Sequence, residues 1–155
     1  DFKQFFNRII DRFELSKSQN VSFHRVLPEK QYFVEIDTDK LTQVIDNIIS
    51  NALKYSPDGG NIRFGFTVKD THMKVMVSDD GMGIPSANVE RIFDRFYRVD
   101  RARARSMGGT GLGLAIAREM IEAHGGSIWV ESEEGQGTTV FFTLEIEINE
   151  EGEWE

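Results

Sequence analysis

The sequence predicts one α/β domain, folded as a two-layer sandwich with a mixed, largely antiparallel sheet. Segments with helical apolar spacing are interspersed with pairs of alternating segments typical of strands, which favours this arrangement over a doubly wound parallel sheet. The chain has 155 residues and is 39% hydrophobic, so it can bury one core without disulfides or a structural metal. Both observations indicate a single domain.

The first part of the chain predicts a helix, two strands and the start of a second helix. Helical spacing with one apolar face covers residues 2–15, at Phe2, Phe5, Phe6, Ile9, Ile10 and Phe13. Residues 21–26 and 32–36 are β-rich runs on either side of Pro28, which indicates a pair of strands. Residues 37–39, Asp-Thr-Asp, then offer N-cap side chains for the second helix.

The second helix has a strongly specified core face. Its apolar residues follow i, i+3, i+4, i+7 spacing, at Leu41, Val44, Ile45, Ile48, Ile49, Ala52 and Leu53. At about 100° per residue, Asn47, Asn51 and Lys54 fall within an arc of roughly 60° beside that stripe. We therefore expect these polar side chains at the edge of the core. The turn residues at 56–60 should end the helix.

The rest of the chain continues the alternation of strands and helices. The predicted order is two alternating strands at residues 62–68 and 73–77, a short amphipathic helix at 89–97, a long apolar helix from about 112 to 124 ended by Gly125 and Gly126, a strand at 127–132, a turn at 135–137, and a final strand that runs through Ile148.

Charge and composition exclude several classes of protein. The net charge is −8, but residues 145–155 hold six glutamates and no basic residue, so the acidity belongs mainly to a tail. We expect a folded domain at residues 1–148, an acidic tail at 149–155, and no nucleic-acid partner. Without cysteines, a signal-peptide pattern or a long apolar run, this part of the chain is predicted to be cytoplasmic and soluble.

The polar flank of the second helix is a candidate metal and phosphate site. The amide oxygens of Asn47 and Asn51 suit a hard cation such as Mg²⁺, which takes further ligands from water and phosphates. Lys54, one turn away, supplies a point charge for the same phosphates. The alternative is a helix whose asparagines simply face water.

A glycine-rich turn follows the strand at residues 73–77. Gly81 and Gly83 come after Asp79 at a spacing that lets the backbone approach a flat ligand closely. The Asp79 carboxylate can accept a hydrogen bond from an exocyclic amine such as that of adenine, and guanine carries a carbonyl at the corresponding position. The alternative is an ordinary turn that contains an aspartate.

A second glycine cluster opens the long helix. Gly109, Gly111 and Gly113 leave backbone N–H groups and the positive end of the helix dipole free to meet an anion. The pattern is neither a Walker loop nor a dinucleotide fingerprint, and the alternative is a flexible hinge. Upstream, Arg95 and Arg98 flank two aromatic residues and could stabilise a transferring γ-phosphoryl group. Arg101, Arg103 and Arg105 are interpreted as a solvated loop.

In this order, the motifs resemble the four boxes of the catalytic, ATP-binding domain of bacterial sensor histidine kinases. Residues 47–55 are similar to the N box, 79–83 to the G1 box, 91–96 to the F box and 109–114 to the G2 box. The resemblance covers almost the whole chain. It implies a Bergerat ATP-binding fold with a mobile ATP lid from about residue 99 to 109.

The resemblance also implies a role for each matching residue. Asn51 would bind Mg²⁺ with help from Asn47, Lys54 would contact phosphate, and Asp79 would bind the adenine amine. Thr138 would support adenine through water, and Arg98 would reach the γ-phosphate with Arg95 behind it or toward the partner domain. The further nucleotide contacts are expected at Tyr55, Gly81, Gly83, Ile84, Gly109, Thr110, Gly111, Leu112 and Gly113.

The chemistry implied is transfer of the ATP γ-phosphoryl group to a histidine on a separate dimerisation domain. Related gyrase and Hsp90 ATPases carry a glutamate in the place of Asn47, and an amide cannot act as that general base. The implied partners are this dimerisation domain and a cognate response regulator, within a membrane-bound homodimer whose pathway controls cell-wall metabolism. The fragment itself is expected to be monomeric. A hydrolytic ATPase and a non-catalytic nucleotide-binding module remain the alternatives.

Overall fold

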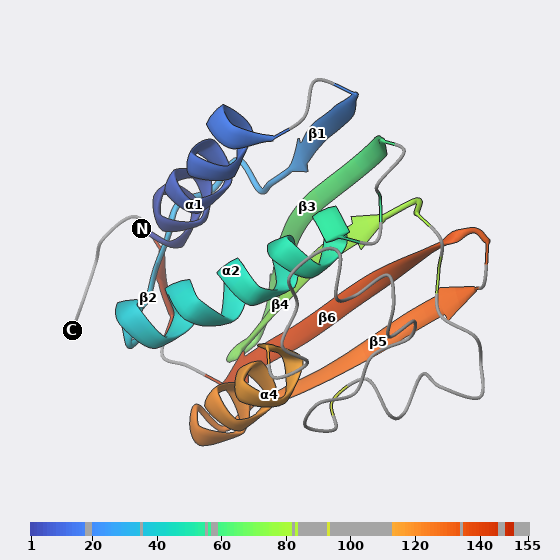
Figure 1. Ribbon diagram of the computed structural model, residues 1–155. Helices are drawn as coiled ribbons and strands as arrows, with labels where there is room; N and C mark the ends of the chain where they lie inside the picture. Colours follow the sequence, from blue (N-terminus) through green and yellow to red (C-terminus); the bar gives the residue numbers. More distant parts are fainter. Residues whose placement is uncertain are drawn as a thin grey trace.

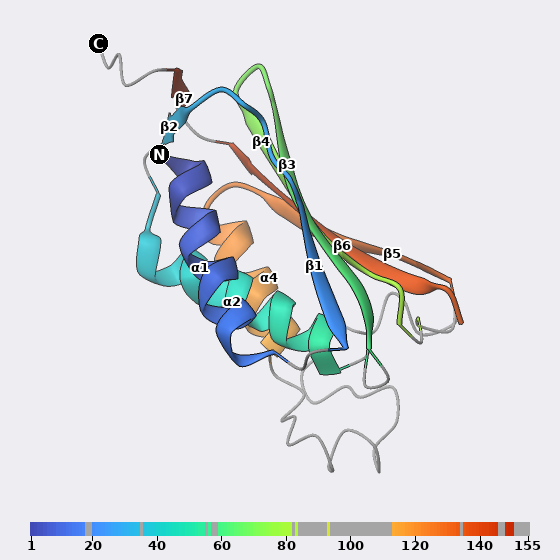
Figure 2. The same cartoon turned by 90° about the horizontal axis from the view of Figure 1, so that it is seen from above.

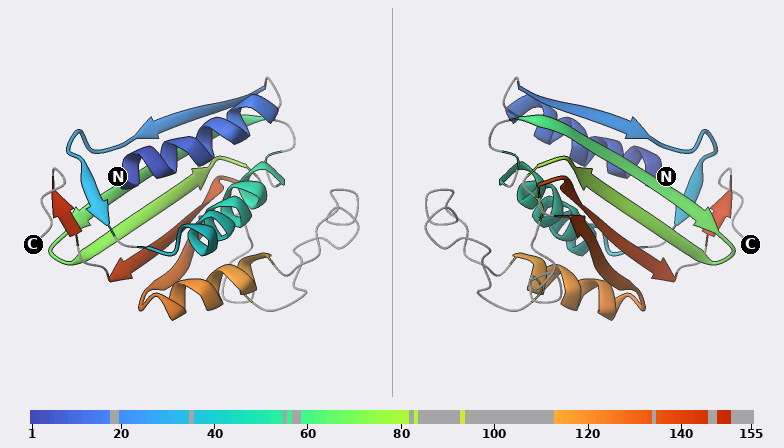
Figure 3. Two further views of the ribbon diagram at one scale, coloured as in Figure 1. Left: turned by 90° about the vertical axis from the view of Figure 1, so that its left-hand side faces the viewer. Right: turned by 90° about the vertical axis from the view of Figure 1, so that its right-hand side faces the viewer.

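The computed structural model describes residues 1–17, 20–34, 36–54, 56, 59–81, 83, 93, 113–133, 135–145 and 148–150. Within them, helices cover one face of a twisted sheet (Figure 1; Figure 3). The elements are α1 (Phe2–Ser16), β1 (Val21–Val26), β2 (Tyr32–Val34), α2 (Thr38–Lys54), β3 (Gly60–Lys69), β4 (His72–Asp79), α4 (Gly113–Ala123), β5 (Ser127–Glu133), β6 (Gly137–Glu145) and β7 (Ile148–Glu150).

The main sheet has the strand order β1-β3-β4-β6-β5. Strand β1 runs parallel to β3, whereas the pairs β3–β4, β4–β6 and β5–β6 are antiparallel. This topology and the layer of helices confirm the predicted two-layer sandwich with a mixed, largely antiparallel sheet. None of the helices in the described residues is long and apolar enough to cross a membrane.

Two predictions about strands were wrong in their pairing or length. Strands do form at residues 21–26 and 32–34, but β1 pairs with β3 and β2 pairs with β7 in a separate two-stranded sheet. The ammonium group of Lys3 donates to the carbonyls of Pro28 and Glu29, both at 3.1 Å. These bonds hold the segment between β1 and β2 against α1. The final strand is also two strands, because β6 ends at Glu145 and β7 belongs to the other sheet.

The core lies between the helices and the sheet. Helix α1 contributes Phe2 and Phe6, whose rings make edge contacts with Phe66 and Phe64 of β3 at centroid distances of 5.0 and 6.1 Å. The apolar stripe predicted for α2 is buried at Leu41, Val44, Ile45, Ile48, Ile49 and Ala52. Periodicity therefore identified the core face of α2 correctly.

Local capping sets the start of α2 and the end of α4. Asp37 caps α2, since its carboxylate accepts the N–H of Lys40 at 3.1 Å. Helix α4 ends in a Schellman motif, in which Gly126 N–H donates to Ile121 and Gly125 N–H donates to Glu122. Gly125 has the positive φ of 76° that this motif needs. The predicted cap and the predicted glycine stop are confirmed.

Four element ends meet at one end of the molecule. The last turn of α2, the last residues of β4, the first turn of α4 and the start of β6 all lie in the lower part of Figure 2. Helix α2 packs against α4 and β4, so the hydrophobic core fixes how these ends stand relative to one another. Segments that are far apart in the sequence therefore converge there.

The contact between the end of α4 and β6 gives a stability prediction. A Cβ on Gly126 would overlap the Thr143 carbonyl of β6, whereas a Cβ on Gly125 would have no atom within 4 Å. We expect Gly126→Ala to lower the free energy of unfolding by about 3 kcal/mol, because packed backbone must move. The control Gly125→Ala should cost only about 1–2 kcal/mol, from its left-handed φ. Urea denaturation of both variants measures the difference, and equal losses would contradict the overlap.

Candidate functional site

Asp79 is a buried carboxylate at the end of β4, with 7% of its surface exposed. Its side chain accepts the Gly81 N–H at 2.9 Å and a backbone hydrogen bond from Thr138. Burial raises the pKa of Asp79 to about 6, and the hydrogen bonds from Gly81 and Thr138 oppose that rise. The site therefore presents an acceptor group whose charge is costly to bury and is held by two N–H donors.

Thr138 lies opposite Asp79 because β6 starts with a glycine. Gly137 has φ +123°, and a Cβ there would collide with the Asp79 carbonyl and with Cα of Asp80. The glycine lets β6 pass close enough for Asp79 and Thr138 to pair in the antiparallel ladder. The predicted turn at residues 135–137 is also present, since residues 135 and 136 form a turn that leads into β6 at Gly137.

A hydroxyl group lies next to the Thr138 side chain. Its Oγ1 lies 2.8 Å from Oγ of Ser132, which also donates to the Gly137 carbonyl at 2.9 Å. On the other face of the sheet, Ser78 and Thr139 are hydrogen-bonded at 2.8 Å. The sequence prediction missed Ser132, although its position across the short hairpin from Thr138 is a signal for a cross-strand hydroxyl pair.

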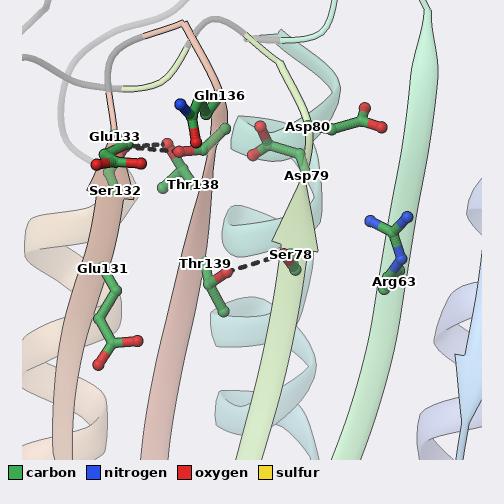
Figure 4. Close-up of a pocket in the computed structure, with 11 residues that line it drawn as sticks. Arg63, Ser78, Asp79, Asp80, Glu131, Ser132, Glu133, Gln136, Thr138 and Thr139 are labelled. Carbon is green, nitrogen blue, oxygen red and sulfur yellow. Dashed lines mark hydrogen bonds between the residues drawn. The ribbon is translucent and has the colours of Figure 1, made fainter.

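An open hollow of about 420 Å³ lies at the ends of β3 to β6. Asp79, Thr138 and Ser132 line it together with charged groups such as Glu131 and Arg63. Figure 4 shows that the Asp79 carboxylate points toward β6, whereas the neighbouring Asp80 points toward β3. The hollow thus carries an acceptor-rich wall at the place where the sequence predicted recognition of an exocyclic amine.

The polar flank of α2 stands on the helical side of the same end of the molecule. Asn47, Asn51 and Lys54 are half-buried beside the fully buried stripe, as the arc of roughly 60° predicted. Among the described residues, these three do not line the hollow around Asp79. The flank of α2 and the hollow around Asp79 therefore lie at the same end of the fold, but within the described part of the chain the flank does not line the hollow.

Helix α4 begins at the same end. Gly113 is its first residue, and Leu114, Ala115 and Ala117 are buried against the core. The N–H groups of a helix start carry partial positive charge and can meet an anion. Gly113, the last glycine of the predicted cluster, thus starts a helix near the residue where the sequence predicted one.

Several predicted site residues lie outside the described residues. They are Tyr55, Ile84, Arg95, Arg98, Gly109, Thr110, Gly111 and Leu112. The predicted lid and nearly all of the predicted short helix at 89–97 also lie outside them. Phe93 is described: it packs against the core, and the Arg118 guanidinium lies 5.9 Å from its ring centroid. The roles of the undescribed residues stay predictions.

The donor set at this end fits a particular kind of metal. No group of three or more His, Cys, Asp or Glu side chains within the described ranges could hold an ion by itself. The neutral amide oxygens of Asn47 and Asn51 fit Mg²⁺, which keeps several waters and takes other ligands from substrate phosphates. A cation here would therefore arrive with an anionic ligand.

Comparisons with known proteins agree with these features. A family model described as "Histidine kinase-, DNA gyrase B-, and HSP90-like ATPase" matches residues 36–148. The sensor histidine kinase WalK of Bacillus subtilis (strain 168) is 56% identical over 154 residues, which are 98% of this chain and 25% of that protein. The sensor protein kinase WalK of Staphylococcus aureus (strain JH9) is 52% identical, over 100% of this chain and 26% of that protein. The chain thus spans about a quarter of the length of these relatives.

Solved structures share the fold. The mycobacterial sensor histidine kinase MprB superposes with a TM-score of 0.80 and 30% identity, and the match covers 94% of this chain and 96% of that chain. The nucleotide-free catalytic domain of the histidine kinase ThkA also gives a TM-score of 0.80 and 30% identity, over 92% and 91% of the two chains. The predicted fold class is therefore confirmed.

The raised pKa of Asp79 predicts how stability depends on pH. The folded-state pKa of about 6 exceeds the ordinary value of 3.8. Between these two pH values Asp79 is therefore protonated in the folded protein and ionised in the unfolded chain. The stability from this group is largest below about pH 4 and is lost as the pH rises through about 6. At about pH 8, Asp79→Asn should therefore raise the free energy of unfolding, by up to about 3 kcal/mol.

Urea denaturation of Asp79→Asn at about pH 8 and about pH 4 measures this effect. The control Asp70→Asn, in the exposed turn after β3, should change stability little at either pH. An equal effect of Asp79→Asn at both pH values would contradict the conclusion that burial opposes its ionisation.

Proposed function

The chain belongs to the histidine kinase-, DNA gyrase B- and HSP90-like ATPase family, and from this we propose that it is the ATP-binding catalytic domain of a two-component sensor histidine kinase. The observation that carries the proposal is the buried Asp79 carboxylate beside Thr138, at the end of the fold where the amide flank of α2 and the start of α4 also lie. Identity of 52–56% to proteins named WalK sensor kinases supports the same function.

Asp79 supports recognition of adenine. An ionised carboxylate accepts hydrogen bonds and donates none, so it favours a base with an exocyclic amine and disfavours the carbonyl of guanine. Two backbone N–H donors already hold the group in place, and Thr138 stands next to it with a hydroxyl. A preorganised acceptor of this kind does not have to be reoriented when the base arrives.

Asn47, Asn51, Lys54 and the start of α4 support binding of the triphosphate. We propose that the two amide oxygens hold Mg²⁺ and that Lys54 and Gly113 N–H contact phosphate oxygens. Bound Mg²⁺ would neutralise part of the phosphate charge and orient the γ-phosphoryl group. Arg98, with Arg95 behind it, is proposed to stabilise the charge of that group during transfer.

Asn47 also supports phosphoryl transfer over hydrolysis. A carboxylate at this position could remove a proton from water, whereas a carboxamide has no basic lone pair at neutral pH. We propose that the acceptor is a histidine imidazole on a dimerisation domain of the same kinase, and that a cognate response regulator then receives the group. The whole protein is proposed to be a homodimer in the cell membrane that controls cell-wall metabolism, with this domain in the cytoplasm.

Nucleotide binding tests the recognition step. We expect the fragment with Mg²⁺ to bind ATP and to prefer it to GTP, and Asp79→Ala to weaken ATP binding by roughly 100-fold, since a desolvated pocket loses its acceptor. Isothermal titration calorimetry measures both affinities. The control Glu131→Ala, a carboxylate at the wall of the same hollow, should leave the affinity within about twofold. Preference for GTP would contradict the proposal.

Binding should also depend on pH through Asp79. Protonation turns one carboxylate oxygen into a donor, so ATP affinity should fall as the pH drops below about 6. The same titrations at about pH 7.5 and about pH 5 measure the change, which is expected to be several-fold. In Asp79→Ala this part of the pH dependence should disappear, and its persistence there would assign the effect to another group.

The transfer step is tested with a separately made dimerisation domain that carries the acceptor histidine. Addition of the fragment and ATP should produce phosphohistidine, and Asn51→Ala should reduce the rate by about 100-fold or more, because the metal loses a ligand. Gln43→Ala, on the exposed side of α2, is the matched control and should transfer normally. Phosphate release at a comparable rate without any acceptor would instead identify a hydrolytic ATPase.

A further inference from the structure

Asp80, the neighbour of Asp79, bonds to the first part of β3. Its Oδ1 accepts the backbone N–H of Asn61 at 2.9 Å, and its Oδ2 accepts the Asn61 side-chain amide at 3.1 Å. These hydrogen bonds lower the pKa of Asp80. The last backbone pair of the β3–β4 ladder joins Ile62 to Asp79, so the Asp80 carboxylate takes the place of the next carbonyl in the ladder.

The Asn61 side chain is held in the orientation that this contact needs. Nε2 of His24 on β1 lies 2.8 Å from Oδ1 of Asn61. The amide oxygen can only accept, so the imidazole donates to it, and the amide NH₂ is left to face Asp80. Three neighbouring strands, β1, β3 and β4, are therefore linked by side chains at the edge of the sheet.

Two glycines leave room for this arrangement. Gly60 has φ +126°, and a Cβ there would overlap Oδ1 of Asp80. On the other side, Gly137 of β6 lies against the Asp79 carbonyl and Cα of Asp80. The backbone of residues 79–80 is thus fixed from both neighbouring strands, by hydrogen bonds from β3 and by close packing of β6.

We propose that Asp80 and Asn61 form a clamp that positions the Asp79 carboxylate for recognition of the base. Asp79 and Asp80 point to opposite sides of β4 (Figure 4). Anchoring Asp80 to β3 therefore fixes the rotation of the strand end that turns Asp79 toward β6. In this arrangement the Gly81 N–H donates to Oδ1 of Asp79.

Both carboxylate oxygens of Asp80 accept hydrogen bonds from Asn61, so the clamp acts through Asp79 as a positioning device. Its loss should affect the contact with the base and leave the contacts with phosphate and metal on α2 unchanged. This inference rests on the proposed function, because it assumes that Asp79 reads adenine. It goes further, because it assigns part of the selectivity for adenine to Asp80 and Asn61, which are outside the expected binding residues.

Asp80→Ala removes both hydrogen bonds to Asn61 and provides the test. We expect ATP affinity, measured by calorimetry with Mg²⁺, to fall about tenfold and the preference for ATP over GTP to shrink by a similar factor. The backbone amide signal of Gly81 in a ¹⁵N-correlated spectrum should also shift. Asp80→Asn retains an acceptor for the Asn61 N–H and should recover part of the affinity.

Glu133→Ala is the matched control, since it removes a carboxylate from the same hollow without touching Asn61. It should keep both the affinity and the base preference of the parent. Asn61→Ala, which keeps the backbone N–H and loses the side-chain bond, is the second variant and should give a smaller loss than Asp80→Ala. Thermal melting identifies any variant that fails to fold, in which case Asn61→Ala decides the result.

The outcomes separate this inference from the proposed function. If the parent binds ATP and Asp79→Ala abolishes binding, but Asp80→Ala and Asn61→Ala bind ATP and reject GTP as the parent does, the clamp is overturned and the function stands. A loss of affinity with unchanged base preference would likewise overturn it, because a general structural effect would suffice. Failure of the parent itself to bind ATP would remove the premise of both.

Discussion

The close approach of β6 to the end of β4 is the constraint on which the rest of the site depends. It is possible because Gly137 has no side chain where the Asp79 carbonyl and Cα of Asp80 lie. It delivers the Thr138 N–H to the Asp79 carboxylate, which also accepts the Gly81 N–H. Burial of a carboxylate is unfavourable unless donors compensate for the lost water. This packing therefore allows an acceptor to stay at the base of an open hollow.

The second constraint is that one face of α2 packs in the core while the adjacent face carries the site residues. Its apolar stripe is almost fully buried, from Leu41 to Ala52, so the rotation of the helix about its axis is fixed by packing. That rotation also sets the positions of the Asn47, Asn51 and Lys54 side chains, because they lie beside the stripe at helical spacing. A ligand that needs amide oxygens in fixed positions gains from this, since the hydrophobic core and not a loop holds them.

Sequence patterns failed where partners are distant in the chain. The strands at residues 21–26 and 32–34 were correctly identified, yet β1 lies beside β3 and β2 pairs with β7, near the far end of the chain. Asn61 and Ser132 were missed for the same reason. Each is an unremarkable polar residue by itself, and each matters only because it meets Asp80 or Thr138 across the sheet. Periodicity records which face a residue occupies and carries no information about the neighbouring strand.

The sequence by itself determined the elements, the buried faces and the chemical types at the site. Apolar spacing specified α1, α2 and α4, alternation specified β3 and β4, and the glycines marked the turns, since these signals depend on local backbone geometry. Tertiary structure alone decided the strand order, the burial that raises the pKa of Asp79 to about 6, and the bonds of Asp80 to Asn61. These features require segments separated along the chain to be packed side by side, and the free energy that selects their arrangement belongs to the whole core.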